Sequence, residues 1–412
     1  MIEVLRHPRF RRLFTAQVVA LTGTGLLTVA LGLLAYDLAG RGAGAVLGTA
    51  LAVKMVAYVV VAPVVSALAE RVPRRVLLVS ADAIRLLIAL MLPFVGEIWQ
   101  IYVLIFVLQS ASATFTPAFQ AVIPAVLPDE RDYTRALSLS RMAYDLESLL
   151  SPALAAVLLA VASYNRLFLG TALGFAVSAV MVLGTPLPRL VPVDREIPLV
   201  RRITRGAGIM LSRPVLRGLL AMNLAVAAAT ALVVVNTVVY VRDLLHAPAW
   251  AVGFALAVFG GGSMVIALCV PRLVGRMSDR QLMLTGCAIL PAGLCAAALL
   301  PVAPDGGRWV LLVAVWAGLG AGTSLINTPS ARLLRAESGP DTRTAVFTAQ
   351  FSLSHACFLI TYPIAGWIGA ALGQFAAAAV LAVLATLATV TAARMWPVDT
   401  ASGVEKVSTG AR

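Results

Sequence analysis

The sequence predicts an all-α membrane protein whose twelve transmembrane helices form two pseudo-symmetric six-helix bundles. Three observations predict this fold class: the composition, the number of long apolar runs and a polar stretch near the middle of the chain. Of the 412 residues, 60% are hydrophobic and only 12% are charged, whereas an ordinary soluble domain has about 25% charged residues. The composition therefore indicates a lipid bilayer as the main partner of the chain.

Twelve apolar runs follow one another along the chain, each close to the ~20 residues that a helix needs to cross a ~30 Å hydrocarbon core. Prolines inside the runs, such as Pro63, Pro117 and Pro152, are compatible with membrane helices because neighbouring helices can satisfy the freed backbone carbonyls. In order, the predicted spans are residues 13–37, 46–68, 76–95, 99–126, 137–162, 167–186, 214–241, 249–271, 281–301, 308–331, 344–371 and 374–396.

A polar stretch from Leu187 to Ser212 follows the sixth run and divides the chain into six spans and six. The pair Glu70-Arg71 after the second run recurs as Asp279-Arg280 after the eighth. Internal repeats of this kind are typical of secondary transporters, whose substrate site lies between the halves near the bilayer midplane. The predicted parts are one bundle over residues 1–186, a cytoplasmic linker over 187–212, a second bundle over 213–396 and a disordered cytoplasmic tail over 397–412.

The basic residues are distributed unevenly, which explains the net charge of +13 without a nucleic-acid partner. With the N-terminus placed inside, 25 of the 32 Lys and Arg residues fall in cytoplasmic segments, whereas the external loops hold four: Arg41, Arg166, Arg242 and Arg308. An excess of positive charge in short loops on one side is the positive-inside signature. The sequence therefore predicts that both termini lie in the cytoplasm.

The loop between the second and third runs reads Ser-Ala-Leu-Ala-Glu-Arg-Val-Pro-Arg-Arg from Ser66 to Arg75. It resembles the signature G-x-x-x-D-R-x-G-R-R of the major facilitator superfamily, with Ser66 and Pro73 in place of the glycines. The match keeps the acid, the arginine after it and the terminal arginine pair, which are Glu70, Arg71, Arg74 and Arg75.

A second copy of this motif follows the eighth run as Gly275-Arg-Met-Ser-Asp279-Arg280. It keeps the glycine, the acid and the arginine of the superfamily signature but loses the terminal arginine pair. An acid–arginine pair at the ends of packed helices can lock a gate between them. The resemblance therefore implies a cytoplasmic gate that involves both loops, in a transporter that needs no cofactor and is not an enzyme.

Two further segments resemble particular branches of the superfamily. Phe115-Thr-Pro117-Ala118 and Ser151-Pro152-Ala-Leu-Ala-Ala are similar to segments of drug–proton antiporters, a branch that includes macrolide and siderophore exporters. The stretch from Asp132 to Glu147 is similar to nickel-resistance exporters, although the chain ends without the histidine-rich tail that those exporters often carry. Both branches remain open as alternatives.

Away from the ends of the apolar runs, ionisable side chains are confined to the first half, because the interiors of the matching runs of the second half hold only His355. A charge at membrane depth costs at least a few kcal/mol, roughly 2.5–3.5 on insertion scales, so it is kept mostly where it pairs, carries a proton or meets a substrate. The six side chains of this kind are therefore candidates for function: Lys54, Asp82, Arg85, Arg141, Asp145 and Glu147.

Glu147 is the predicted protonation site. Arg141 and Asp145 share one face of their helix as an i,i+4 pair, whereas Glu147 lies on a different face without a cation on its own helix. Lys54 is the candidate counter-ion for Glu147; alternatively its long side chain reaches the outer interface. We expect Glu147 to carry the proton with Asp145 as a coupled second site, or else both acids are structural pairs within the first half.

The remaining polar residues of the spans have predicted roles in gating or substrate binding. Asp82 and Arg85 lie three residues apart near the inner end of the third run, where they are expected to pair with each other or with the Glu70 loop. In the second half, the side chains that could face a central cavity are Asn223, Asn236, Asn327 and His355, and the last is equally compatible with a core histidine. The chain contains no G-x-x-x-x-G-K-[ST] motif for ATP and no metal-type cluster.

Together these observations predict a secondary active transporter of the bacterial inner membrane that works by alternating access. We expect a monomer that exports a small amphipathic or cationic, drug-like solute in exchange for protons, as multidrug-resistance antiporters do. The close alternative is an exporter of nickel, cobalt or another metal ion. Import, or a sensor or membrane enzyme on the same scaffold, are further alternatives because a fold sets neither direction nor substrate.

Overall fold

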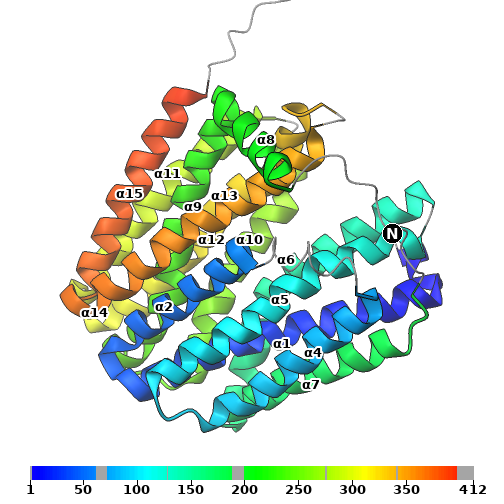
Figure 1. Cartoon of the computed structure of the whole chain (residues 1–412). Helices are drawn as coiled ribbons and strands as arrows, with labels where there is room; N and C mark the ends of the chain where they lie inside the picture. The colour runs from blue at the N-terminus through cyan, green and yellow to red at the C-terminus, as the bar shows by residue number, and fades with distance from the viewer. Residues whose placement is uncertain are drawn as a thin grey trace, which may run out of the picture.

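The computed structural model describes residues 2–61, 72–127, 129–187, 199–273, 276–339 and 342–396, and helices dominate throughout (Figure 1). A short 3-10 helix, η1 (Ile2–Arg6), precedes the first long helix. The helices of the first half are α1 (Pro8–Ala39), α2 (Ala43–Val56) with its π-helical extension η3 (Ala57–Val61), α4 (Arg74–Met91), α5 (Ile98–Val126), α6 (Glu130–Val161) and α7 (Asn165–Leu183).

The second half repeats this pattern after one additional helix, α8 (Leu199–Ser212), which lies in the stretch predicted as a linker. Two of its spans change to π-helix near one end, at η6 and η8. The helices are α9 (Pro214–Val239) with η6 (Tyr240–Leu244), α10 (Trp250–Leu273), α11 (Asp279–Ala298), α12 (Asp305–Ala336), α13 (Arg343–Pro363) with η8 (Ile364–Ile368) and α14 (Gly369–Leu372), and α15 (Gln374–Met395).

In the described part of the chain, each of the twelve predicted spans falls on a helix, which confirms the predicted fold class. Among the described residues, ten helical stretches are long and apolar enough to cross a membrane, and the first of them, Pro8–Val61, holds both α1 and α2. The remaining span, which is the fifth in chain order, is helix α6. Among its described residues, Leu150–Val161 form a shorter apolar stretch, and the charged residues of the helix, including Glu147, precede it.

Local sequence signals explain where several helices begin and end. Proline occupies the first position of α1 and of α9, where its missing N–H is unpaired in any case. Ser278 caps α11, since its hydroxyl accepts from the Gln281 N–H and the Gln281 side chain accepts from the Ser278 N–H. Gly373 has a φ of 89°, a left-handed conformation that suits glycine and separates α14 from α15.

The helices form two groups that converge at one end of the molecule. We call the end at which α1 begins the proximal end and the opposite one the distal end. In Figure 1, the group that contains α1, α4, α5 and α7 diverges toward the proximal end from the group that contains α9, α11, α13 and α15. At the distal end the two groups lie together.

The distal end is closed by close backbone contacts between the two halves. A Cβ on Gly48 of α2 would lie 2.5 Å from the Tyr362 carbonyl of α13, and a Cβ on Gly253 of α10 would lie 2.8 Å from the Pro152 carbonyl of α6. An ion pair joins the same ends, because Arg41 Nε lies 3.1 Å from Asp243 Oδ2. Small residues at both seams therefore let the helices of the two halves pack at van der Waals contact.

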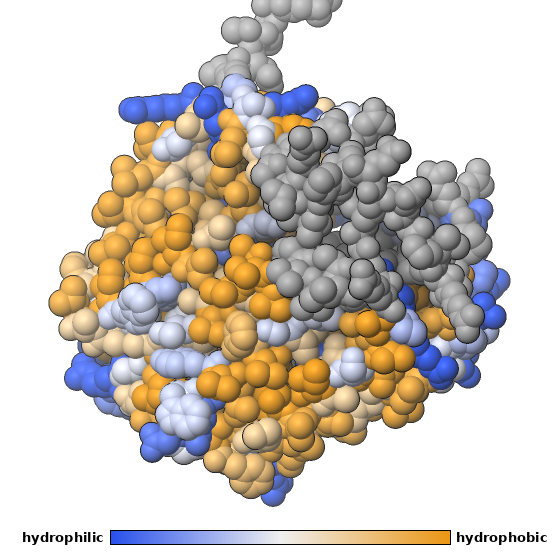
Figure 2. Space-filling model, viewed as in Figure 1, coloured by the Kyte–Doolittle hydropathy of each residue, from blue (hydrophilic) through white to orange (hydrophobic). Residues whose placement is uncertain are grey.

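The outer surface is that of a membrane protein. Figure 2 shows hydrophobic residues over much of the visible side of both groups of helices, with the most hydrophilic residues toward the edges of the view. Large apolar side chains such as Phe94, Val161, Leu173 and Val310 are mostly exposed. In water such a surface would be unfavourable, whereas lipid tails are as apolar as the side chains that face them.

Candidate functional site

The predicted protonation site joins two helices of the first half. Lys54 on α2 and Glu147 on α6 interact electrostatically across the space between these helices. The carboxylate of Glu147 also reaches α1, where its Oε1 lies 3.0 Å from the position that a Cβ would occupy on Gly25. The absence of a side chain at Gly25 therefore leaves room for the acid between α1 and α6.

Lys54 connects this acid to a group of aromatic rings that crosses between the two halves. Its Nζ lies 6.0 Å from the ring centroid of Tyr58, one turn further along the same span. The Tyr58 ring lies 5.6 Å from His355 and 6.4 Å from Phe351, both on α13. We call Tyr58, Phe351, His355 and Phe358 the aromatic group. A cation near aromatic faces is favourable in a low-dielectric site.

The geometry around His355 defines its hydrogen-bonding capacity. Its Nδ1 lies 2.7 Å from the Phe351 carbonyl oxygen, which can only accept a hydrogen bond. Nδ1 therefore carries the proton, and in the neutral ring Nε2 is an acceptor. The imidazole lies 4.1 Å from the Phe351 ring and 6.4 Å from the Phe358 ring, so it is part of an apolar wall with one polar atom.

Asp82 and Arg85 form a separate buried pair. As their spacing predicts, the two side chains of α4 pair with each other, and Asp82 also accepts a 2.7 Å hydrogen bond from Ser178 Oγ on α7. The guanidinium carbon of Arg85 lies 4.2 Å from the ring centroid of Phe115 on α5 and 4.5 Å from that of Phe175 on α7. The pair thus holds three helices of the first half together.

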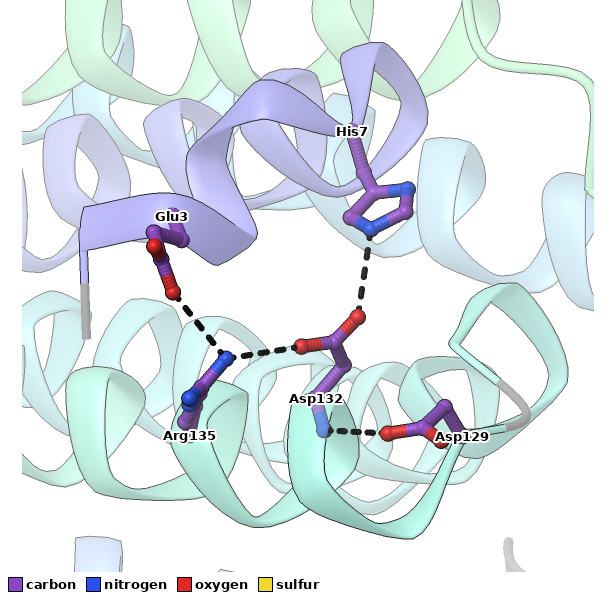
Figure 3. A network of polar contacts seen from close by, with 5 residues as sticks. All are labelled: Glu3, His7, Asp129, Asp132 and Arg135. Carbon is purple, nitrogen blue, oxygen red and sulfur yellow. Dashed lines mark hydrogen bonds and ion pairs between the residues drawn. The ribbon is translucent and has the colours of Figure 1, made fainter.

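The proximal ends of α1 and α6 are joined by a surface network (Figure 3). Arg135 lies 3.3 Å from Glu3 and 3.4 Å from Asp132, and Asp132 Oδ2 lies 3.2 Å from His7 Nε2. The Asp132 N–H also bonds Asp129 Oδ1 at 3.1 Å, which shapes the first turn of α6. These contacts fix the start of the helix that carries Glu147.

Comparison with known families supports the motif resemblance over most of the chain. Residues 13–324 match the model of the Major Facilitator Superfamily. The chain belongs to this superfamily. The resemblance carried by the two acid–arginine loops is therefore confirmed, and the twelve-helix arrangement is that of a membrane transporter.

Relatives of known name come from the same superfamily. Macrolide efflux protein A of Streptococcus pyogenes is 26% identical over 187 residues, which are 44% of this chain and 45% of that protein. The protein of the same name from Enterococcus faecalis is 28% identical over 138 residues, 32% of this chain and 42% of that one. The uncharacterized MFS-type transporter YfiS of Bacillus subtilis is 27% identical over 227 residues, 52% of each chain. The matches span about half the length of these relatives.

Solved structures agree with the fold. The nucleoside transporter NupG superposes with a TM-score of 0.74 over 94% of this chain and 98% of its own, at 13% identity. A bacterial homologue of the lysosomal transporter Spinster gives a TM-score of 0.72 over 95% and 97%, at 11% identity. A POT family transporter gives 0.71 over 92% and 94%, also at 11% identity. At such identities the likeness shows the major facilitator fold alone.

The second superfamily motif connects the proximal ends of three helices. Asp279 does not pair with Arg280; it accepts hydrogen bonds from Arg332 of α12, one of them from Nε at 3.1 Å. Arg280 instead donates to the carbonyls of Trp396 and Ala393, at 3.3 and 3.4 Å, at the end of α15. A cation near these unpaired carbonyls complements the helix end.

Other predicted site residues differ in how the structure places them. Arg74 and Arg75 lie in the first turn of α4. The first motif's Ser66, Glu70 and Arg71, and Gly275 of the second, lie outside the described residues. For Arg141 and Asp145 the structure describes the helix, α6, but not the side chains, so their predicted pair and the coupling of Asp145 to Glu147 stay predictions.

The three asparagines of the second half do not share one environment. Asn236 has no exposed surface and donates to the Ala365 carbonyl at 3.0 Å, so it packs α9 against η8 rather than facing a cavity as expected. Asn223 is buried in α9, and its Nδ2 has no partner among the described residues. Asn327 is exposed on α12. Of the second-half candidates, His355 alone lies beside Lys54 in the described part of the chain.

Sequence reasoning missed the residues that complete these contacts. Phe351, Phe358 and Tyr362 recur at helical spacing around the predicted His355, so one aromatic face of α13 could have been recognised. Arg332 and Ser178 carried no signal, because each meets its partner across a helix boundary. Among the described residues no group of three or more His, Cys, Asp and Glu side chains lies close enough to hold a metal ion.

Proposed function

We propose that the chain is a proton-coupled exporter of small amphipathic or cationic solutes. The observation that carries this proposal is the continuity of Glu147, Lys54 and the aromatic group from α6 through α2 to α13. It links an acid that can bind a proton to apolar surface contributed by both halves. The names of the macrolide efflux relatives support export of a bulky amphipathic solute.

The proposed exchange depends on competition for Glu147. The ionised carboxylate is stabilised by Lys54, and protonation removes that interaction and frees the ammonium. Lys54 then interacts more strongly with the Tyr58 ring and with a solute beside it. A cationic solute competes with the proton directly, while a neutral amphipathic solute binds the rings and the Nε2 acceptor of His355. Binding of proton and solute in turn is what an antiporter requires.

The proposed orientation places the proximal end in the cytoplasm. Its support is the excess of Lys and Arg in the segments that connect helices at this end. With the distal end closed by the α2–α13 and α6–α10 contacts, this arrangement is the inward-facing member of an alternating-access pair. The proton enters from the distal side in the opposite state and leaves Glu147 in this one.

The decisive experiment is transport into inverted membrane vesicles from a panel of a macrolide, a lipophilic cation, a nucleoside and Ni²⁺. We expect uptake of the first two to depend on a proton gradient and to be lost in Glu147→Gln. Glu3→Gln, which alters a surface carboxylate of the proximal network, is the matched control and should transport normally. Gradient-dependent uptake by inserted Glu147→Gln protein would refute the coupling role, and uptake of Ni²⁺ alone would favour the metal-exporter alternative.

A further inference from the structure

Helices α1 and α6 run side by side in the same direction, and one register holds over most of their length. At the proximal end His7 Nε2 lies 3.2 Å from Asp132 Oδ2 (Figure 3). At mid-depth Gly25 lies against Ser151, so closely that a Cβ on the glycine would overlap the serine side chain. The second contact lies about 18 residues further along each helix, or about 27 Å at 1.5 Å per residue. We call the contact between these helices the α1–α6 seam.

Buried polar atoms without partners line this seam around Glu147. Ser140, Glu147 and Ser151 are spaced by seven and four residues, which places them on one face of α6. The hydroxyl oxygens of Ser140 and Ser151 have no hydrogen-bond partner among the described residues, although the two residues are only 8% and 0% exposed. On α1, Gln17 is 4% exposed, and its Oε1 also has no partner among the described residues. In the register set by the two contacts of the seam, Gln17 is level with residues 142–143 of α6.

Such atoms are costly unless they are hydrogen-bonded. A buried polar group without a partner destabilises the folded protein, and ordered water commonly satisfies the groups that no protein atom reaches. Ser151 lies close to the Glu147 carboxyl group, because both side chains approach the position of a Cβ on Gly25. We propose that the α1–α6 seam binds a short chain of water molecules, anchored by Ser140, Ser151 and Gln17, that solvates Glu147 and carries its proton.

This proposal rests on Glu147 being the coupling site and adds the path by which its proton moves. The acid gives its proton to an adjacent water, which passes one of its own protons to the next; one O–H bond breaks and one forms at each step, and no electrons are exchanged. The carboxylate that remains is stabilised by bound water and by Lys54. Among the described neighbours Lys54 is the charged residue facing this acid, since residues 13–35 of α1 and 250–271 of α10 contain no Lys, Arg, Asp, Glu or His.

The seam is sealed toward the proximal end. Phe10, Leu13, Ala136 and Leu139 are buried in one apolar cluster that lies between Ser140 and the surface network of His7 and Asp132. Water chains do not cross closely packed apolar side chains, so a proton cannot pass along the seam to the proximal surface. The proton must instead leave the water chain into the space between the two halves. Its release from there depends on which end of the protein is open. The sealed seam thereby prevents an uncoupled proton leak.

The test compares proton-driven transport with solute exchange in proteoliposomes. Exchange of labelled for unlabelled solute without a gradient needs no net proton transfer. In Ser140→Ala and Ser151→Ala we expect exchange to stay within about twofold, while proton-driven transport falls about tenfold, the effect of ~1.4 kcal/mol on a rate. The pH of half-maximal transport should rise by roughly one unit, because a carboxylate with fewer bonds binds its proton more firmly.

The matched control is Thr171→Val on the other side of α1. The Thr171 hydroxyl is buried as well, but it already bonds the Gly23 carbonyl at 2.8 Å and the Leu167 carbonyl at 3.0 Å. Loss of the Thr171 hydroxyl can weaken packing, but it removes no group that is available to bind water. We expect any change in this variant to affect exchange and proton-driven transport equally, without a shift of the pH profile.

Each outcome separates this inference from the function on which it rests. If Glu147→Gln abolishes proton-driven transport but both serine variants behave like Thr171→Val, the water chain is wrong and the coupling site stands. If Glu147→Gln retains proton-driven transport, both the water chain and the coupling role of Glu147 are wrong. A further variant, Leu139→Ser, opens the seal: liposomes that contain it should lose an imposed pH gradient faster than wild-type liposomes without any solute. Liposomes that remain tight would refute the seal.

Discussion

Gly366 in η8 lies against Gly44 in α2, so closely that a Cβ on Gly366 would overlap the Gly44 carbonyl oxygen. The same contact places Asn236 Oδ1 2.7 Å from the position of a Cβ on Gly44. Three helices from both halves thus meet at one point of the distal end. The indole Nε1 of Trp367 adds a 2.9 Å hydrogen bond to Thr49 Oγ1 beside it. The close approach of α2 to η8 at the distal end therefore requires glycine at both positions.

The first prediction is that Gly366→Val holds the distal end open. Cysteines at positions 41 and 243, whose native side chains form an ion pair, should cross-link readily in an otherwise cysteine-free protein. Adding Gly366→Val should reduce this cross-linking severalfold, because the valine side chain cannot fit against Gly44. Gly96→Val, at a glycine with open space around it, is the control and should leave cross-linking unchanged. Equal cross-linking in both variants would contradict this account of closure.

The second prediction concerns the buried pair of α4. Arg85→Ala leaves Asp82 with its charge uncompensated at 0% exposure, and breaking a buried pair in this way costs about 3–5 kcal/mol. Ser178→Ala removes one hydrogen bond to the carboxylate, which is worth about 1.5–3 kcal/mol. In detergent, the unfolding temperature should decrease strongly in Arg85→Ala and less in Ser178→Ala. A double variant, Asp82→Ala with Arg85→Ala, should recover part of the loss.

The third prediction contrasts this pair with Asp279 and Arg332. Their side chains are 24% and 51% exposed, so solvent screens them and removing the pair costs at most about 1 kcal/mol. Asp279→Asn should barely change the unfolding temperature. If the pair acts in the predicted gate, the same variant should nevertheless alter the transport rate. The exchange of charges in Asp279→Arg with Arg332→Asp should then restore it, and failure of restoration would assign the effect to Asp279 alone.

The fourth prediction is a shift in the pH dependence of transport. Lys54→Met removes the cation that interacts with Glu147, and the protonated acid is then favoured. Since the proton must be released in each cycle, half-maximal transport should move to higher pH. Arg308→Met, which removes a cation that pairs with Asp305 of its own helix rather than across the two halves, serves as the control. An unchanged pH profile in Lys54→Met would show that the two groups are not coupled in the working protein.

The fifth prediction concerns Tyr164 in the turn between α6 and α7. Burial, together with a hydrogen bond and the negative charge of Asp37, raises the pKa of Tyr164 to about 12 from an ordinary 10.0. The folded protein therefore binds this proton more tightly than the unfolded chain does. The resulting stability is complete below pH 10.0 and is lost as the pH rises toward about 12.

Asp37→Asn tests this relationship because it removes the charge and keeps an acceptor. The pKa of Tyr164 should then fall toward its ordinary value, as measured by ultraviolet absorbance of the phenolate against a Tyr164→Phe reference. Burial, the larger cause, is retained in this variant, so the decrease should be partial. No decrease would mean that burial alone sets the titration.

Features that depend on neighbouring residues could be predicted from the sequence. Each span was recognisable because a helix in lipid must present about 20 apolar residues wherever it lies. Asp82 and Arg85 were recognisable as a pair because helix geometry brings residues three apart together. Contacts such as Arg332 with Asp279 were not, because they depend on how two helices are rotated against each other.

The sequence by itself determined the number of spans, the division into two halves and the confinement of buried charge to the first half. The tertiary structure alone decided which charges meet: Lys54 lies 93 positions before Glu147 and 301 before His355, yet it interacts with both. It also decided that the distal end is closed. The physical reason is that the hydropathy of a span needs only lipid around it, whereas a cross-helix pair or a glycine seam exists only once particular faces are packed together.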